Sequence, residues 1–346
     1  MTIRIAAIGT SHWHALNDPA YLRQLARMPD VQLVGLHDDD LAVAQRRSSE
    51  VGGPPAFVDH RQMLDDTRPD FIIALGRHDR MAGLALELLD RGLPFLMEKP
   101  MGLNAREVER VAIEARKRRA FVAVPMPQRF SPFWAQAQRL RAADAFGPLS
   151  HMYVRMNRFT PKRYPAWDCP WMLDPTLSGG GCLRNLGAHA FDMMAQFTEE
   201  EPEVVAAQVS HLARCERVED FVTVMLRTPS GVLGTIEIGY AYPRLPTPDN
   251  QGPGRDKLLD GADGEWKVAG RDALLMAKDG MLRIVTRDAE HNLPGDSSVS
   301  PSFQLLRDAL DRWQRGEAPL VGVEDCLRAA RLTDDAYRLA GVMLPN

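Results

Sequence analysis

Short, continuous apolar segments alternate with amphipathic segments over the first 125 residues, and this alternation constrains the fold more than any other feature. The apolar runs lie at residues 3–8, 31–36, 71–75, 95–97 and 121–124. The stretches between them carry apolar residues at helical spacing. Strands that are apolar on both faces are typical of a parallel sheet covered by helices on both sides. Residues 1–125 are therefore predicted to form a doubly wound α/β domain.

The pattern changes in the later part of the chain. Segments with alternating apolar and polar residues predict strands of a large, mostly antiparallel open sheet at 150–159, 204–212, 218–227 and 232–242. Helical spacing returns at 303–313 and 323–339, in helices that could pack back on either domain. A length of 346 residues fits two domains. We expect them at 1–125 and 126–346, the second an α+β domain.

Composition excludes several classes of protein. Forty-two basic and 46 acidic residues give a net charge of -4, so no broad basic surface is predicted and nucleic acid is not expected as a partner. The four cysteines are scattered and form no C-x-x-C pair, which favours a reducing compartment. No apolar run of 18 residues and no signal-peptide pattern is present, so the sequence predicts a cytoplasmic protein that does not bind membranes.

The carboxyl ends of the predicted parallel strands are where a ligand of such a sheet binds, and they place Gly9, Asp38, Gly76 and the residues after Met97 together. A carboxylate at Asp38 can accept both ribose hydroxyls of adenosine and would repel a 2′-phosphate. It therefore favours NAD over NADP. The alternative is that Asp38–Asp40 form a solvated loop and helix cap.

The loop after the first strand departs from a regular dinucleotide motif. The run Gly9-Thr10-Ser11-His12-Trp13-His14 keeps only the first glycine of G-x-G-x-x-G. Histidines two residues apart can share a metal ion, but no third ligand is visible nearby in the sequence. No metal site is therefore predicted, and the histidines are expected to hydrogen-bond the backbone or a cofactor phosphate.

Two motifs about eighty residues apart resemble those of the Gfo/Idh/MocA oxidoreductases, the family of glucose-fructose oxidoreductase and inositol dehydrogenase. They are Glu98-Lys99-Pro100 and Gly179-Gly180-Gly181 followed by Asn185, Gly187, His189 and Asp192. The likeness covers nearly the whole chain. It implies an N-terminal Rossmann domain and NAD(P)-dependent hydride transfer on sugars, polyols or related compounds. It also implies a homodimer or homotetramer formed through the C-terminal sheet.

The resemblance also implies roles for single residues. Lys99 would contact the reacting oxygen and the nicotinamide ribose, with Glu98 and Pro100 directing it, and a cation there stabilises developing alkoxide charge. His189 would be the general acid or base. Asn185 stands where the family most often has aspartate; it can orient its neighbours but carries no charge. We therefore expect lower pKa values of both His189 and Lys99 than in aspartate-bearing relatives.

Other positions are candidates for cofactor and substrate contacts. Gly76-Arg77-His78-Asp79-Arg80 replaces the family's usual T-P-N-x-x-H, and Arg77 or Arg80 either contacts phosphate or forms a structural ion pair with Asp79. Basic and aromatic side chains suit a sugar or polyol, and an arginine pair suits a carboxylated one. The candidates of this kind are Arg129, Arg163, Trp167 and Trp171, each of which also has a purely structural interpretation.

Three functions follow from these residues. The first is a two-domain NAD-dependent dehydrogenase or reductase that uses Lys99, His189 and Asn185. The second is a redox-neutral glycosidase or lyase that oxidises its substrate transiently and retains NAD. The third is a non-catalytic ligand sensor on the same scaffold, which the altered glycine loop favours and the presence of Lys99 and His189 disfavours.

Overall fold

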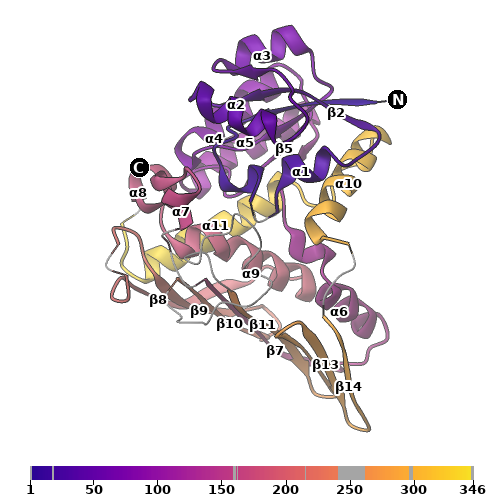
Figure 1. Cartoon of the computed structure of the whole chain (residues 1–346). Coiled ribbons are helices and arrows are strands. Elements are labelled where there is room, and N and C mark those ends of the chain that lie inside the picture. Colours follow the sequence, from indigo (N-terminus) through magenta and orange to yellow (C-terminus); the bar gives the residue numbers. More distant parts are fainter. Residues whose placement is uncertain are drawn as a thin grey trace.

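The chain builds two sheets with helices between and around them (Figure 1). A computed structural model describes residues 2–17, 19–158, 161, 163–214, 216–240, 262–295 and 299–343. Within this part, none of the helices combines the length and the apolarity that crossing a bilayer requires.

The first sheet has six strands in the order β3-β2-β1-β4-β5-β6, and all of its pairings are parallel. Its strands are β1 (Ile3–Ile8), β2 (Val31–His37), β3 (Ala56–Phe57), β4 (Phe71–Ala74), β5 (Phe95–Met97) and β6 (Val122–Ala123). This is the Rossmann order, so the predicted doubly wound sheet is confirmed. Strands β4 and β5 are buried at every residue, which explains their continuous apolar sequence.

Helices connect these parallel strands. A 3-10 helix, η1 (Trp13–Ala15), and α1 (Tyr21–Leu25) follow β1; the other connecting helices are α2 (Leu41–Ser49), α3 (His60–Thr67), α4 (His78–Asp90) and α5 (Ala105–Arg118). Asp40, Asp59 and Asn104 cap α2, α3 and α5, because each side chain accepts a hydrogen bond from a backbone N–H of the first turn.

The second sheet has eight strands in the order β14-β13-β12-β11-β7-β10-β9-β8. Its strands are β7 (Leu149–Arg158), β8 (Glu203–Ser210), β9 (Phe221–Arg227), β10 (Leu233–Gly239), β11 (Ala262–Gly270), β12 (Ala273–Lys278), β13 (Met281–Thr286) and β14 (Glu290–Pro294). Only β7 and β10 pair in parallel, so the expected mostly antiparallel sheet is confirmed. The strands β11–β14 were not among those predicted.

One helix, α9 (Cys182–Thr198), lies between the second sheet and the rest of the molecule and is buried along almost its whole length. The chain reaches it from the first sheet through η2 (Pro127–Phe130), α6 (Pro132–Ala142), β7, α7 (Arg163–Ala166), η3 (Pro170–Leu173) and α8 (Pro175–Ser178). Because α9 contacts β7, β9 and β10, its position is fixed by the sheet.

The end of the chain returns to the first sheet (Figure 1). Helix α10 (Pro301–Gln314) places Leu305, Leu306, Ala309 and Leu310 in the same apolar cluster as Ile3 and Ile5 of β1. Helix α11 (Val323–Leu339) packs against α5 and α9. The C-terminal helices thus join elements that are far apart in the sequence.

Candidate active site

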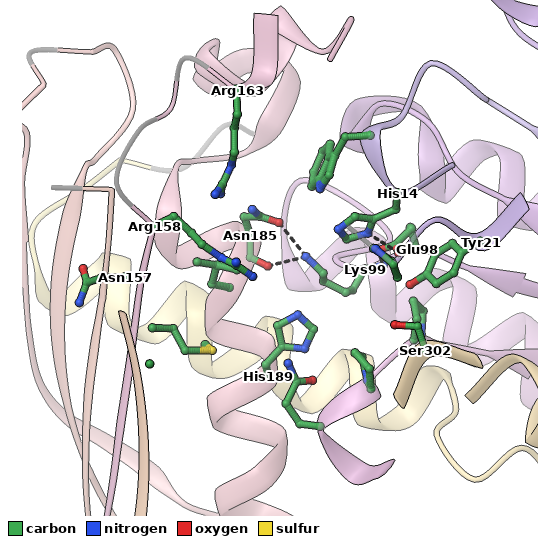
Figure 2. A pocket seen from close by; sticks show the side chains of 18 of the residues that line it. His14, Tyr21, Glu98, Lys99, Asn157, Arg158, Arg163, Asn185, His189 and Ser302 are labelled. Atoms are coloured by element: carbon green, nitrogen blue, oxygen red, sulfur yellow. Dashed lines mark hydrogen bonds and ion pairs between the residues drawn. The ribbon is translucent and has the colours of Figure 1, made fainter. Parts of the chain in front are cut away.

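A buried lysine at the end of β5 meets helix α9. Lys99 is 2% exposed, and its Nζ donates to the backbone O of Asn185 at 2.5 Å and to its side-chain Oδ1 at 2.7 Å (Figure 2). The Lys99–Pro100 peptide bond is cis. The structure therefore brings the two motifs together, as the resemblance implied.

Two tyrosines fix the orientation of the Asn185 amide. Its Nδ2 donates to Tyr164 Oη at 2.8 Å and to Tyr240 Oη at 3.3 Å, and the two phenol oxygens are 2.5 Å apart. The guanidinium of Arg163 lies over both rings, at 4.9 and 5.1 Å from their centroids. Because the Nδ2 group faces the tyrosines, the Oδ1 atom of Asn185 faces Lys99 Nζ.

His189 lies one helical turn after Asn185 and shares the same cavity. Its Nδ1 is buried and has no hydrogen-bond partner among the described residues. Burial lowers the pKa of His189 well below its usual value, and the positive charge of Lys99 adds to the shift. The imidazole is therefore neutral near pH 7 and able to accept a proton.

The glycine triplet and Glu219 hold the start of α9. A Cβ on Gly180 would lie 2.1 Å from Tyr337 Oη, and one on Gly181 would lie 2.3 Å from the backbone O of Glu219. The Glu219 carboxylate accepts from the N–H of Gly181 at 2.8 Å, from that of Leu183 at 3.0 Å and from Tyr337 Oη at 2.6 Å. Glycine is thus required sterically, and Glu219 satisfies N–H groups of the first turn. Sequence reasoning missed Glu219.

A cavity of about 270 Å³ opens over these groups (Figure 2). Lys99, Asn185 and His189 line it, and its charged or polar lining also includes His14, Glu98, Asn157, Arg158 and Arg163. The amide of Asn157 is 1% exposed and has no hydrogen-bond partner among the described residues. This polar wall suits a small substrate with several hydroxyl groups.

The loop histidines have a third potential ligand after all. Ligand-type atoms of His12, His14 and Glu98 lie within 4.8 Å of one another, so the expectation of no nearby third ligand is corrected. Glu98 is 84 positions after His14 in the sequence. The two residues meet because the loop after β1 lies beside the end of β5. Two of the ring nitrogens already have partners: His14 Nδ1 lies 2.7 Å from Glu98 Oε1, and His12 Nδ1 accepts from the N–H of His14 at 3.2 Å.

A second cavity, of about 850 Å³, lies at the carboxyl ends of β1, β2 and β4. Gly9 and Gly76 approach there so closely that a Cβ on Gly9 would lie 2.8 Å from Gly76 Cα. Asp38 is 4% exposed, and its carboxylate accepts from the N–H of Ser11 at 2.5 Å and of Asp40 at 3.2 Å. Asp38 is therefore not a solvated loop residue. Volume, glycine contact and carboxylate fit the adenosine half of a dinucleotide.

The remaining residues predicted to bind cofactor have varied positions. Arg77 lines the second cavity and forms a two-point ion pair with Asp79, at 3.0 and 2.8 Å. Thr10 is buried, and its Oγ1 donates to the backbone O of His37 at 3.2 Å, which ties the loop to β2. Ser11 lines the second cavity and Glu98 the first.

An aromatic cluster of His12, Trp13 and Trp171 lies between the two cavities. The His12 ring stacks on Trp13 with centroids 3.9 Å apart, and Trp13 and Trp171 are 6.2 Å apart. Trp13 lines the first cavity and Trp171 the second. The cluster therefore joins the lining of one cavity to the lining of the other.

The four proposed substrate residues do not gather at one place. Arg163 lines the first cavity and Trp171 the second, whereas Trp167 and Arg129 line neither. Arg129 instead forms a buried ion pair, with its Nε 2.8 Å from Asp192 and its Nη2 3.0 Å from Asp325. The structure thus supports the structural interpretation of Arg129.

A Rossmann sheet with a nucleotide-sized cavity beside a buried lysine and a neutral histidine defines an NAD(P)-dependent dehydrogenase. Residues 3–126 match the model of the oxidoreductase family with an NAD-binding Rossmann fold, and residues 134–250 match that of the GFO/IDH/MocA C-terminal domain. The chain belongs to the Gfo/Idh/MocA family of oxidoreductases.

Relatives agree with this assignment. The trans-1,2-dihydrobenzene-1,2-diol dehydrogenase of Bos taurus is 29% identical over 331 residues, which are 94% of this chain and 93% of that protein. The structure of GenD2 from gentamicin A biosynthesis, in complex with NAD, has a TM-score of 0.81 at 19% identity and covers 100% of this chain and 97% of its own. KijD10, a 3-ketoreductase from Actinomadura kijaniata in complex with NADP and TDP-benzene, has a TM-score of 0.79 at 17% identity over 98% of both chains. At these identities the two structures share the fold.

Proposed function

We propose that this protein transfers a hydride between a nicotinamide cofactor and the CH–OH carbon of a sugar, polyol or related compound. The observation that carries the proposal is the contact of Lys99 with Asn185 next to neutral His189 in one polar cavity. The bovine relative is named for a diol, in keeping with a hydroxylated substrate.

Each of the three residues has a distinct task in this reaction, for which the bound nicotinamide supplies or accepts the hydride. The Lys99 ammonium faces the reacting oxygen and stabilises the negative charge that develops there. His189 takes the hydroxyl proton during oxidation and returns it during reduction. Asn185 is a positioning residue, because both of its oxygens hold Lys99 Nζ.

NAD is the cofactor that the second cavity favours. Asp38 would accept the adenosine ribose hydroxyls and repel a 2′-phosphate. Gly9, Ser11, Gly76 and Arg77 would surround the pyrophosphate and ribose groups, because they line the same cavity. Thr10 and His12 would support this loop from behind, and Glu98 and Lys99 would lie at the nicotinamide end.

The proposal is tested first by calorimetric binding of NAD, NADH, NADP and NADPH to the purified protein, after a denatured sample has been examined for retained nucleotide. We expect NAD(H) to bind more tightly than NADP(H). In a subsequent screen of polyols and sugars, we expect the protein to form NADH with one of them. Lys99→Met should abolish turnover and keep NAD binding. Absence of binding at millimolar nucleotide would refute the dehydrogenase assignment.

The open sheet is the surface through which we propose a homodimer or homotetramer. Val205, Met225 and Leu233 are apolar, belong to β8, β9 and β10, and are each more than 40% exposed. Apolar side chains on neighbouring strands of an uncovered sheet face suit a subunit interface. Light scattering, which measures the mass of the particle in solution, tests this proposal on the wild type and on Met225→Lys. We expect an oligomeric wild type and a weakened oligomer in the variant, and a monomeric wild type would contradict the proposal.

A further inference from the structure

The cavity contains a second imidazole that the family's motifs do not assign. His14 Nδ1 lies 2.7 Å from Glu98 Oε1, and both residues line the same cavity as Lys99 and His189. In Figure 2, His14 and His189 lie on opposite sides of Lys99. No hydrogen-bond partner within the described ranges is found for His14 Nε2.

The carboxylate of Glu98 makes the two imidazoles chemically different. Its side chain is 1% exposed. Burial alone would raise the pKa of Glu98, but His14, through its charge when protonated and through its hydrogen bond, outweighs burial together with the charge of Lys99 and holds this pKa below its usual range. An ionised carboxylate only accepts hydrogen bonds, so Nδ1 of His14 carries the proton and Nε2 presents its lone pair. Among the residues that the structure describes, His189 Nδ1 has no such partner.

We propose that His14, oriented by Glu98, is a second proton-transfer residue of this active site. A histidine whose Nδ1–H is held by a buried carboxylate, with Nε2 facing a substrate cavity, has the arrangement of the base in hydrolytic triads. The carboxylate fixes the tautomer and stabilises the imidazolium that forms when Nε2 takes a proton. His14, which stands where G-x-G-x-x-G has its third glycine, thereby acquires a catalytic purpose.

Two proton-transfer groups permit more than alcohol oxidation, and this step rests on the proposed function. Once hydride loss has produced a ketone, His14 Nε2 can take the proton from the adjacent carbon. The C–H electron pair then forms the C=C bond of an enolate, whose oxygen faces Lys99. Return of the proton to the carbon regenerates the ketone. Alternatively, loss of an oxygen substituent one carbon further on, protonated by an imidazolium, completes an elimination. The site thus suits a hydroxylated substrate that is isomerised or cleaved while it is oxidised.

The proton-holding part of the proposal is tested without substrate. In protein labelled with 15N-histidine, we expect the His14 signals of a neutral ring protonated at Nδ1, and loss of that preference in Glu98→Gln. A ring protonated at Nε2, or an unchanged tautomer in the variant, would overturn the proposal. So would a tightly bound metal whose removal by chelator shifts the His12 and His14 signals. The measurement needs no nucleotide, so it stands apart from failure of the proposed function.

The catalytic part is tested with the substrate from the polyol and sugar screen. His14→Asn should lower the rate of proton exchange at the carbon beside the carbonyl by roughly 10²- to 10⁴-fold and leave the Kd for NAD within about twofold. His151→Asn, on the second sheet and hydrogen-bonded to Ser150, is the matched control. Deuterium exchange from D₂O at the carbon beside the carbonyl should vanish in His14→Asn only. Unchanged exchange in His14→Asn would overturn the proposal.

Discussion

Replacing Asn185 by aspartate tests how charge in the cavity controls His189. The two residues are one helical turn apart, so their side chains are about 6 Å from each other. A unit charge at that distance contributes roughly 2.8 kcal/mol at an effective dielectric constant of about 20, equivalent to ~2 pKa units. The ammonium of Lys99 contacts the same oxygen and offsets part of this, so we expect the pKa of His189 to rise by about one unit.

The direction follows from the charge. A carboxylate stabilises the imidazolium, so the folded protein holds its proton to higher pH and the acid limb of kcat/KM moves upward. NMR titration of His189 and the pH profile measure the same shift independently. Asn185→Ala is the uncharged control: it removes the side-chain contacts of Asn185 without adding charge. In this variant the pKa of His189 must stay within a few tenths of a unit of the wild-type value. A folded Asn185→Asp protein with an unmoved His189 titration would refute the electrostatic reasoning.

Three further predictions concern residues around the site. Arg129→Ala should lower the free energy of unfolding by about 3–5 kcal/mol, because it leaves the buried carboxylate of Asp192 unpaired. Urea denaturation measures this change. A loss of substrate affinity with unchanged stability would contradict the prediction. Burial lowers the pKa of His78 to about 3, so the unfolded state binds the additional proton below about pH 6.5. Unfolding should then become easier by ~1.4 kcal/mol per pH unit between those values, and His78→Gln should reduce that slope in urea titrations at pH 7 and 5. Asp38→Ala should weaken NAD binding at least about tenfold and narrow the preference over NADP in calorimetry; an unaltered preference would show that Asp38 serves only the loop.

Many strands were predictable from the pattern that burial leaves in the sequence, although β12 and β13 also alternate and were not predicted. β4 is buried at every residue and reads as a continuous apolar run, whereas β9 and β10 alternate because one face is covered. β14 escaped prediction because it is an edge strand with mostly exposed residues, held by backbone pairing with β13. Backbone pairing of this kind requires no apolar pattern.

The residues of the site also differ in how far they could be predicted: those in short motifs were found, and those that meet through distant contacts were not. Lys99, Asn185 and His189 were found because each belongs to a short motif. Tyr240 meets Tyr164 over 76 residues, and His14 meets Glu98 over 84. Contacts across such separations depend on how the sheets pack, and nothing in the local sequence of either partner marks them.

Helix α10 has a consequence for synthesis on the ribosome. The cluster that covers one face of the first sheet contains Leu305, Leu306 and Leu310, so residues 1–125 cannot complete it alone. The ribosome must add roughly 190 more residues after position 125 before α10 is finished, which takes about 10–40 s at ordinary elongation rates. During that interval the nascent first sheet exposes apolar surface that chaperones can bind. Residues 1–125 are therefore made first but cannot complete their apolar core until α10 has been made.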